Sequence, residues 1–170
     1  ALRQGDCSRF TFHVEASAAM YLDSMVFWSA SQGRRRWFVV HEDSDQGRRL
    51  AQAATRAITK HGRGGEQVGV AASLPAQPRY GDDMDAILES GADSILLLLD
   101  DADQIAFLGQ QESYRVDAPS VAFPVALAQS RNYIASADLR SPATAPDHRI
   151  TLWETTLRAN GAAEFNQLFM

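Results

Sequence analysis

The sequence predicts an α/β domain in which a Rossmann-like parallel sheet of about four to five strands carries helices on both faces. Short apolar runs of strand length alternate with segments whose apolar residues recur every three or four positions. The strand-to-strand interval is roughly 25–30 residues, the length of a βαβ unit. The run SILLLL is apolar at successive positions, which is typical of a strand covered on both faces. The predicted order is helix 17–30, strand 36–41, helix 45–61, strand 67–72, helix 80–90, strand 94–99, helix 102–114 and strand 120–123.

The first four elements are justified by their apolar spacing and by the residues at their ends. The opening helix has Ser17 as its expected N-cap, and the turn signal Ser31-Gln-Gly33 separates it from the strand RWFVVH. The next helix is expected to begin at Asp45, again as an N-cap, and to stop at Gly62. The short apolar run QVGVAA then predicts the second strand.

The last four elements keep the same rhythm as far as Phe123. The third helix places Met84 on an apolar face, and Gly91 ends it. The SILLLL strand leads through an acidic turn into the fourth helix, and SVAF forms the fourth strand. The alternation then breaks, because residues 125–149 are mixed in character and residues 150–170 start a further helical stretch.

Composition excludes several classes of function. The net charge is −5, whereas a general nucleic-acid binder carries a basic excess. Cys7 is the only cysteine, so neither an internal disulfide nor a cysteine-based zinc site can form. No apolar run approaches the roughly 18 residues that a membrane-spanning helix needs.

Common catalytic and phosphate-binding motifs are absent from the sequence. It contains no Gly-x-Gly-x-x-Gly, no Walker loop and no Gly-x-Ser-x-Gly nucleophile elbow. A phospho-acceptor receiver domain needs a lysine at the end of a late strand, but the only lysine, Lys60, lies on a predicted helix. Two basic or glycine-rich segments, residues 34–36 and residues 62–65, precede strands at the amino edge of the sheet. They are expected to be a solvated face and a turn.

Acidic and amide side chains follow the predicted strands where ligands bind in open parallel sheets, beyond the strands' carboxyl ends. These segments predict a cleft lined by acids, amides and helix N-termini. The alternative for Asp45 and Asp103 is that they only cap the helices that follow. The residues expected to bind a ligand there are Asp45, Gln46, Asp100, Asp101, Phe123 and Pro124.

Two other functions remain open from the residues themselves. A small α/β enzyme with an acidic, metal-assisted site would use His41, Asp43, Asp100 and Asp101, although their spacing matches no common zinc or calcium loop. An interaction module that self-associates through exposed surface is the other alternative.

Six segments carry a resemblance to a known family in their order and spacing. They are residues 9–12 (RFTF), 17–20 (SAAM), 37–47 (WFVVHEDSDQG), 91–97 (GADSILL), 104–110 (QIAFLGQ) and 118–124 (APSVAFP). Together they resemble the second lobe of a type I periplasmic substrate-binding protein of the leucine/isoleucine/valine-binding kind. Further segments are similar to a subgroup associated with alcohol oxidation that depends on pyrroloquinoline quinone (PQQ). These segments are residues 6–9, His13, residues 17–20, residues 152–154 and residues 161–166.

The resemblance has departures at the expected ligand site. Amino-acid-binding members place a tyrosine where Gln46 stands and another near Asp100. They also carry an acidic residue just past the fourth strand, where this chain has Pro124-Val-Ala126. The resemblance therefore does not carry specificity for amino acids over to this chain.

The resemblance implies a non-enzymatic, cofactor-free solute-binding component of an ABC uptake system in the periplasm. Residues 9–125 would form the ligand-binding lobe, and residues 126–170 a return segment toward a first lobe that this chain lacks. A small polar molecule would bind as the two lobes close, and a permease would be the membrane partner. Residues 1–14 do not have the pattern of a signal peptide.

Overall fold

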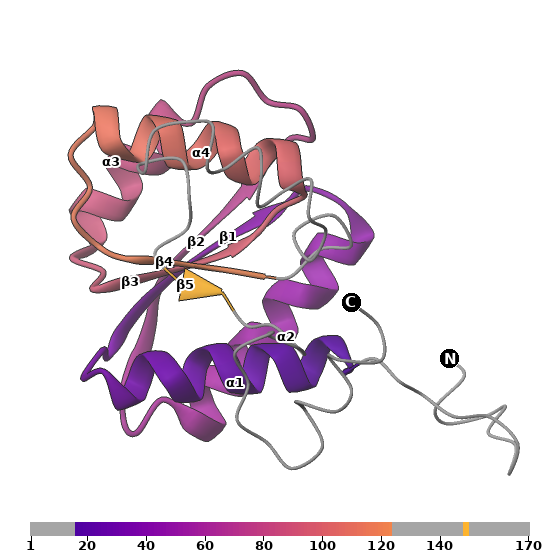
Figure 1. Cartoon of the computed structure of the whole chain (residues 1–170), viewed down its shortest axis with the longest axis vertical. Coiled ribbons are helices and arrows are strands. Elements are labelled where there is room, and N and C mark those ends of the chain that lie inside the picture. Colours follow the sequence, from indigo (N-terminus) through magenta and orange to yellow (C-terminus); the bar gives the residue numbers. More distant parts are fainter. Residues whose placement is uncertain (1–15, 124–147, 150–170) are drawn as a thin grey trace, which may run out of the picture. The chain divides into compact units, whose positions relative to one another are not determined.

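The computed structural model describes residues 16–123 and 148–149, in which helices and strands alternate (Figure 1). The elements are α1 (Ala18–Ser31), β1 (Arg36–Glu42), α2 (Asp45–His61), β2 (Glu66–Ser73), α3 (Gly81–Ser90), β3 (Ser94–Leu98), α4 (Asp101–Ser113), β4 (Ser120–Ala122) and β5 (His148–Arg149). The eight elements predicted from the sequence are confirmed to within one residue at each end. The short strand β5 was not predicted, because two residues carry no detectable period.

The five strands form one sheet in the order β2-β1-β3-β4-β5, and every pairing is parallel. From β1 the chain first crosses to β2 on one side and then returns to β3 on the other side. The carboxyl ends of β1 and β3 therefore border the point at which the strand order reverses. In open α/β sheets this switch point is where ligands bind.

Helices cover both faces of the sheet, as the buried runs of β1 and β3 require (Figure 1). On the face of α3 and α4, an apolar cluster surrounds Phe38, Tyr80 and Phe107, which are buried. On the face of α1 and α2, Trp37 is fully buried, and its indole N–H donates to Ser29 Oγ at 3.1 Å. Burial of each large apolar side chain contributes about 1.5–3 kcal/mol, so both faces hold the sheet in place.

A β-bulge in the edge strand β2 shifts the register of its pairing with β1. Trp37 pairs with Gln67 and Phe38 pairs with Gly69, so Val68 is an extra residue between them. Gly69 lies directly against the Phe38 ring, because a Cβ at this position would be 2.3 Å from Phe38 Cε2. A glycine is therefore required where β2 passes over this ring.

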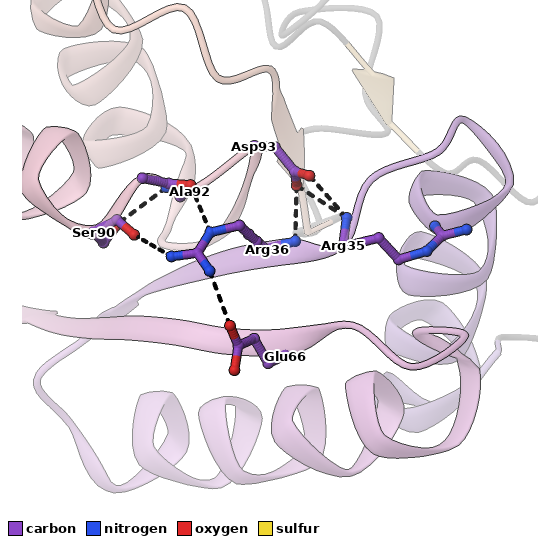
Figure 2. A network of polar contacts seen from close by, with 7 residues as sticks. Arg35, Arg36, Glu66, Ser90, Ala92 and Asp93 are labelled. Atoms are coloured by element: carbon purple, nitrogen blue, oxygen red, sulfur yellow. Dashed lines mark hydrogen bonds and ion pairs between the residues drawn. The ribbon is translucent and has the colours of Figure 1, made fainter.

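Arg35 and Arg36 at the amino edge form a specific polar network, and the exposed Arg36 agrees with the solvated face predicted for residues 34–36 (Figure 2). The Asp93 carboxylate accepts the backbone N–H groups of Arg35 and Arg36 at 2.9 Å each. The Arg36 guanidinium donates to the carbonyl oxygens of Ser90 and Gly91 at 2.7 and 2.9 Å, and pairs with Glu66 at 2.9 Å. The last carbonyl groups of a helix have no intrahelical hydrogen-bond donor. The Arg36 guanidinium supplies donors to such carbonyl groups at the end of α3.

Candidate functional site

A pocket of about 120 Å³ lies at the carboxyl edge of the sheet, beside the switch point between β1 and β3. It combines the end of β1, the first turns of α2, the β3–α4 connection and the residue after β4. Its lining residues are Glu42, Ser44, Gln46, Gly47, Leu50, Leu98, Leu99, Asp100 and Phe123.

The turn from β1 into α2 is built by a serine cap and a close backbone approach. Ser44 Oγ accepts the N–H of Gly47 at 3.0 Å, so the N-cap is Ser44 and not Asp45 as predicted. Gly47 packs on the backbone of Glu42, and a Cβ at Gly47 would lie 1.9 Å from the Glu42 carbonyl oxygen. Only glycine permits this approach, which places the start of α2 directly beside the end of β1.

The turn from β3 into α4 is capped by Asp100, whose Oδ1 accepts the N–H of Asp103 at 3.0 Å. Gln104, one residue farther along α4, is fully buried. Its side-chain amide donates to the carbonyl oxygens of Leu99 and Phe123 at 2.8 and 3.0 Å. Gln104 therefore ties together the chain ends after β3 and β4, both of which line the pocket.

Gln104 is a residue that sequence reasoning missed as part of the site's framework. A glutamine on a short amphipathic helix has the same appearance whether it faces water or the protein interior. The available signal was its place in the first turn of a helix that follows a fully apolar strand. At that place a buried amide can reach the unpaired carbonyls at strand ends.

The loop between β2 and α3 is held against α4 at the same edge of the sheet. Asp103 is buried, and its Oδ2 accepts the N–H of Ala76 at 2.9 Å, so Asp103 is not the helix cap that the sequence suggested. Nearby, Asp83 accepts a hydrogen bond from the Ser73 hydroxyl at 3.0 Å. Partial burial raises the pKa of the Asp83 carboxyl above its ordinary value, against the opposing effect of this hydrogen bond.

The carboxylates around the pocket fall into two groups. Asp43 and Asp45 pair with the Arg48 guanidinium at 2.6 and 2.8 Å, and this pairing lowers the pKa of Asp45. Glu42 and Asp100 line the pocket, and neither takes part in an ion pair within the described part of the chain. Among the described residues that line the pocket, none is a lysine, arginine or histidine.

The structure gives different outcomes for the six predicted site residues. Gln46, Asp100 and Phe123 come together around the pocket. Asp45 points its carboxylate to Arg48 and is mostly exposed, and Asp101 begins α4 without lining the pocket. Pro124 lies outside the described residues. Sequence reasoning missed Glu42, Leu50 and Leu99, because their side chains face the pocket only through the turn geometry.

The metal-assisted alternative finds no geometric support in residues 16–123. No three His, Cys, Asp or Glu side chains gather there as a metal ion would require. His41 is buried within the sheet, with Nδ1 2.8 Å from the Glu42 carbonyl oxygen. Within the same residues, no helix combines the length and the apolar character needed to cross a bilayer.

A parallel α/β domain with a small pocket at its switch point has the arrangement at which open α/β sheets bind ligands. Residues 1–162 match the sequence profile of the family described as periplasmic binding protein, and the chain belongs to that family. This confirms the resemblance found in the sequence and the predicted fold of one type I lobe. Among curated proteins, none matches this chain.

Solved structures of this class share the fold. A branched-chain amino acid ABC transporter periplasmic ligand-binding protein from Burkholderia xenovorans is 17% identical, with a TM-score of 0.74. A leucine-, isoleucine-, valine-, threonine- and alanine-binding protein from Brucella ovis is 12% identical, with a TM-score of 0.74. An R. palustris ABC transporter solute-binding protein, in complex with benzoate, is 11% identical with a TM-score of 0.69.

The chain spans less than half of these proteins. The matches cover 89% of this chain in each case, but only 39%, 37% and 40% of the three structures in the same order. The likeness therefore establishes one lobe of the fold. The assignment to the PQQ-associated subgroup stays a prediction.

Proposed function

We propose that the chain is the ligand-binding lobe of a solute-binding component of an ABC uptake system. It binds a small polar molecule at the pocket between the ends of β1 and β3. The observation that carries this proposal is the convergence of three strand ends and two capped helix N-termini on one pocket. Membership of the periplasmic binding protein family supports the same assignment.

The size of the pocket supports a half-site that a second lobe completes. Its volume of about 120 Å³ is below the roughly 300–1,000 Å³ of complete small-molecule sites. We infer that residues 9–125 form one wall and that residues 126–170 lead toward the first lobe. Ligand bound between the lobes would then favour the closed form, because both walls contact the ligand only after closure.

The proposals on catalysis, location and partners follow from this role. The family consists of binding proteins, so the chain is proposed to act without catalysing a reaction. The protein would be located in the periplasm, and its partners would be a first lobe and a membrane permease.

The test is a two-dimensional ¹H–¹⁵N NMR titration of the chain with L-leucine, benzoate and short-chain amines and alcohols, each at millimolar concentration. The proposal expects shifts confined to the pocket amides, such as those of Gly47 and Asp100. The variant Gln46→Ala should weaken binding, whereas Gln52→Ala, exposed on the same helix, should not. Shifts that map away from the pocket, or an absence of shifts with every compound, would refute it.

A further inference from the structure

A second cavity, of about 160 Å³, lies at the amino edge of the sheet, at the opposite end of the strands from the pocket. This amino-edge cavity lies between residues 28–34, Ser94 and residues 119–121, where α1 ends and β3 and β4 begin. We propose that it binds a small carboxylate, a monoanion of about six non-hydrogen atoms with an apolar body. The inference goes beyond the proposed function, because it uses none of the residues at the pocket.

Arg34 lines the cavity with a positive charge that the lobe's own groups leave unused. Within the described residues, its guanidinium takes part in no ion pair and no side-chain hydrogen bond. By contrast, the guanidinium groups of Arg35 and Arg36 donate to backbone carbonyl groups, as Figure 2 shows for Arg36. The Arg34 backbone N–H donates to the Ser29 carbonyl oxygen at 3.2 Å, which fixes this half-buried residue beside the cavity. An unpaired, half-buried guanidinium favours an anionic ligand.

Two buried serines in the cavity wall leave one hydroxyl hydrogen without an acceptor. Ser29 and Ser94 are fully buried, and their Oγ atoms share one hydrogen bond of 3.0 Å. The Trp37 indole N–H, which can only donate, already occupies a lone pair of Ser29 Oγ. Whichever serine donates to the other, the second hydroxyl hydrogen finds no acceptor among the described residues. A buried donor without a partner is costly, and a ligand oxygen in the cavity would satisfy it.

The end of α1 does not oppose an anion in this cavity. The last carbonyl groups of a helix carry partial negative charge, which disfavours an anion unless the protein's own donors engage them. The carbonyl groups of residues 28–30 are engaged. Their donors are Ser31 Oγ, the Arg34 backbone N–H and the Arg35 guanidinium. Among the described residues that line the cavity, none is acidic.

The remaining walls set the size and the apolar character of the ligand. Trp28, Pro119 and Val121 line the cavity beside the polar groups. An apolar cavity of about 150 Å³ holds one benzene molecule, which has six non-hydrogen atoms. The amino-edge cavity therefore admits a short branched carboxylate and is too small for benzoate or L-leucine. Its single cationic side chain matches a single negative charge.

The experiment compares a carboxylate with a neutral molecule of the same shape. The full chain is titrated at neutral pH and constant ionic strength with 2-methylpropanoate, 2-methylpropanamide and inorganic phosphate, and ¹H–¹⁵N NMR shifts give the dissociation constants. The carboxylate is expected to move the Ser94 amide and the Trp37 indole N–H, and to bind about tenfold more tightly than 2-methylpropanamide. Phosphate should bind more weakly than the carboxylate, because it gains nothing from the apolar walls.

A matched pair of variants tests the role of Arg34. Arg34→Gln should reduce affinity for 2-methylpropanoate about tenfold and leave affinity for 2-methylpropanamide unchanged, because it removes the charge and keeps a polar side chain. Arg56→Gln removes the same charge from an exposed position on α2 and should change neither affinity. Unchanged amide spectra away from the cavity show that both variants are folded.

The outcomes that contradict the inference are distinct from those that bear on the proposed function. Equal affinities for 2-methylpropanoate and 2-methylpropanamide would overturn it, as would carboxylate affinity that survives Arg34→Gln. Phosphate binding as tight as carboxylate binding would overturn the assignment of an apolar carboxylate. If none of the three compounds moved the Ser94 amide or the Trp37 indole, the cavity would not be a ligand site. The amides of Gly47 and Asp100 report the pocket separately, so each of these results leaves the proposed function standing.

Discussion

The side-chain amide of Gln104 donates a hydrogen bond of 3.0 Å to the carbonyl oxygen of Phe123. The same nitrogen donates to Leu99, so one buried group on α4 joins the chain after β3 to the chain after β4. These two strands are already paired along their length. Gln104 extends their alignment to the edge where the pocket lies.

Replacing Gln104 by leucine should destabilise the protein by about 2–4 kcal/mol, because two buried carbonyl oxygens lose their donor. The free energy of unfolding from urea denaturation measures this loss. Gln52→Leu, on the exposed surface of α2, is the control and should change stability by less than about 0.5 kcal/mol. A similar small effect at Gln104 would show that the bridge does not hold the strand ends together.

Gly47→Ala should destabilise the protein by at least about 2 kcal/mol, because the new Cβ meets a backbone oxygen that cannot move freely. It should also abolish ligand binding, since the start of α2 must shift away from β1. Thermal unfolding and the NMR titration check the two effects. Gly81→Ala is the control, because its Cβ would meet only the tip of the exposed Tyr114 side chain. Equal effects of the two substitutions would contradict the close-approach argument.

Asp93→Ala should cost about 1–3 kcal/mol in unfolding free energy, because the backbone N–H groups of Arg35 and Arg36 lose their shared acceptor. Chemical denaturation measures this value. Asp85→Ala removes the same carboxylate from an exposed position on α3 and should be close to neutral. Ligand affinity should survive in both variants, because the Asp93 network occupies the opposite edge of the sheet from the pocket. A loss of binding in Asp93→Ala would link the two edges.

The stability of the protein should depend on pH through Asp83. Burial raises the pKa of Asp83 in the folded state above its ordinary value of 3.8, so the folded protein holds this proton longer than the unfolded chain does. Its contribution to stability is therefore fully present below pH 3.8 and declines as pH rises through the folded pKa. Asp83→Asn removes this decline, so the variant should gain stability relative to the parent between pH 4 and pH 7. Unfolding curves at both pH values check the sign, and a relative loss would contradict it.

Much of the fold was predictable, because the periods that define helices and strands are local. Apolar spacing located the elements to within one residue, and the apolar run ending at Leu99 identified a strand covered on both faces. The site was predictable only in part. Phe123 directly follows β4, Asp100 lies in the connection after β3, and Gln46 lies in the first turn of the helix after β1. Asp45 occupies an equivalent place in the sequence, but an ion pair with Arg48 takes its carboxylate elsewhere.

The sequence by itself determined the class of fold, the order of its elements and the edge of the sheet where the pocket lies. Periodicity suffices for the elements, since it depends on neighbours a few positions away, and the alternation of strands and helices then indicates the parallel sheet. Only the tertiary structure decided which side chains act together. Asp93 reaches Arg36 across 57 positions, and Gln104 reaches Phe123 across 19. Buried backbone groups must find partners once the chain is compact, and the packed geometry determines which side chains are close enough to supply them.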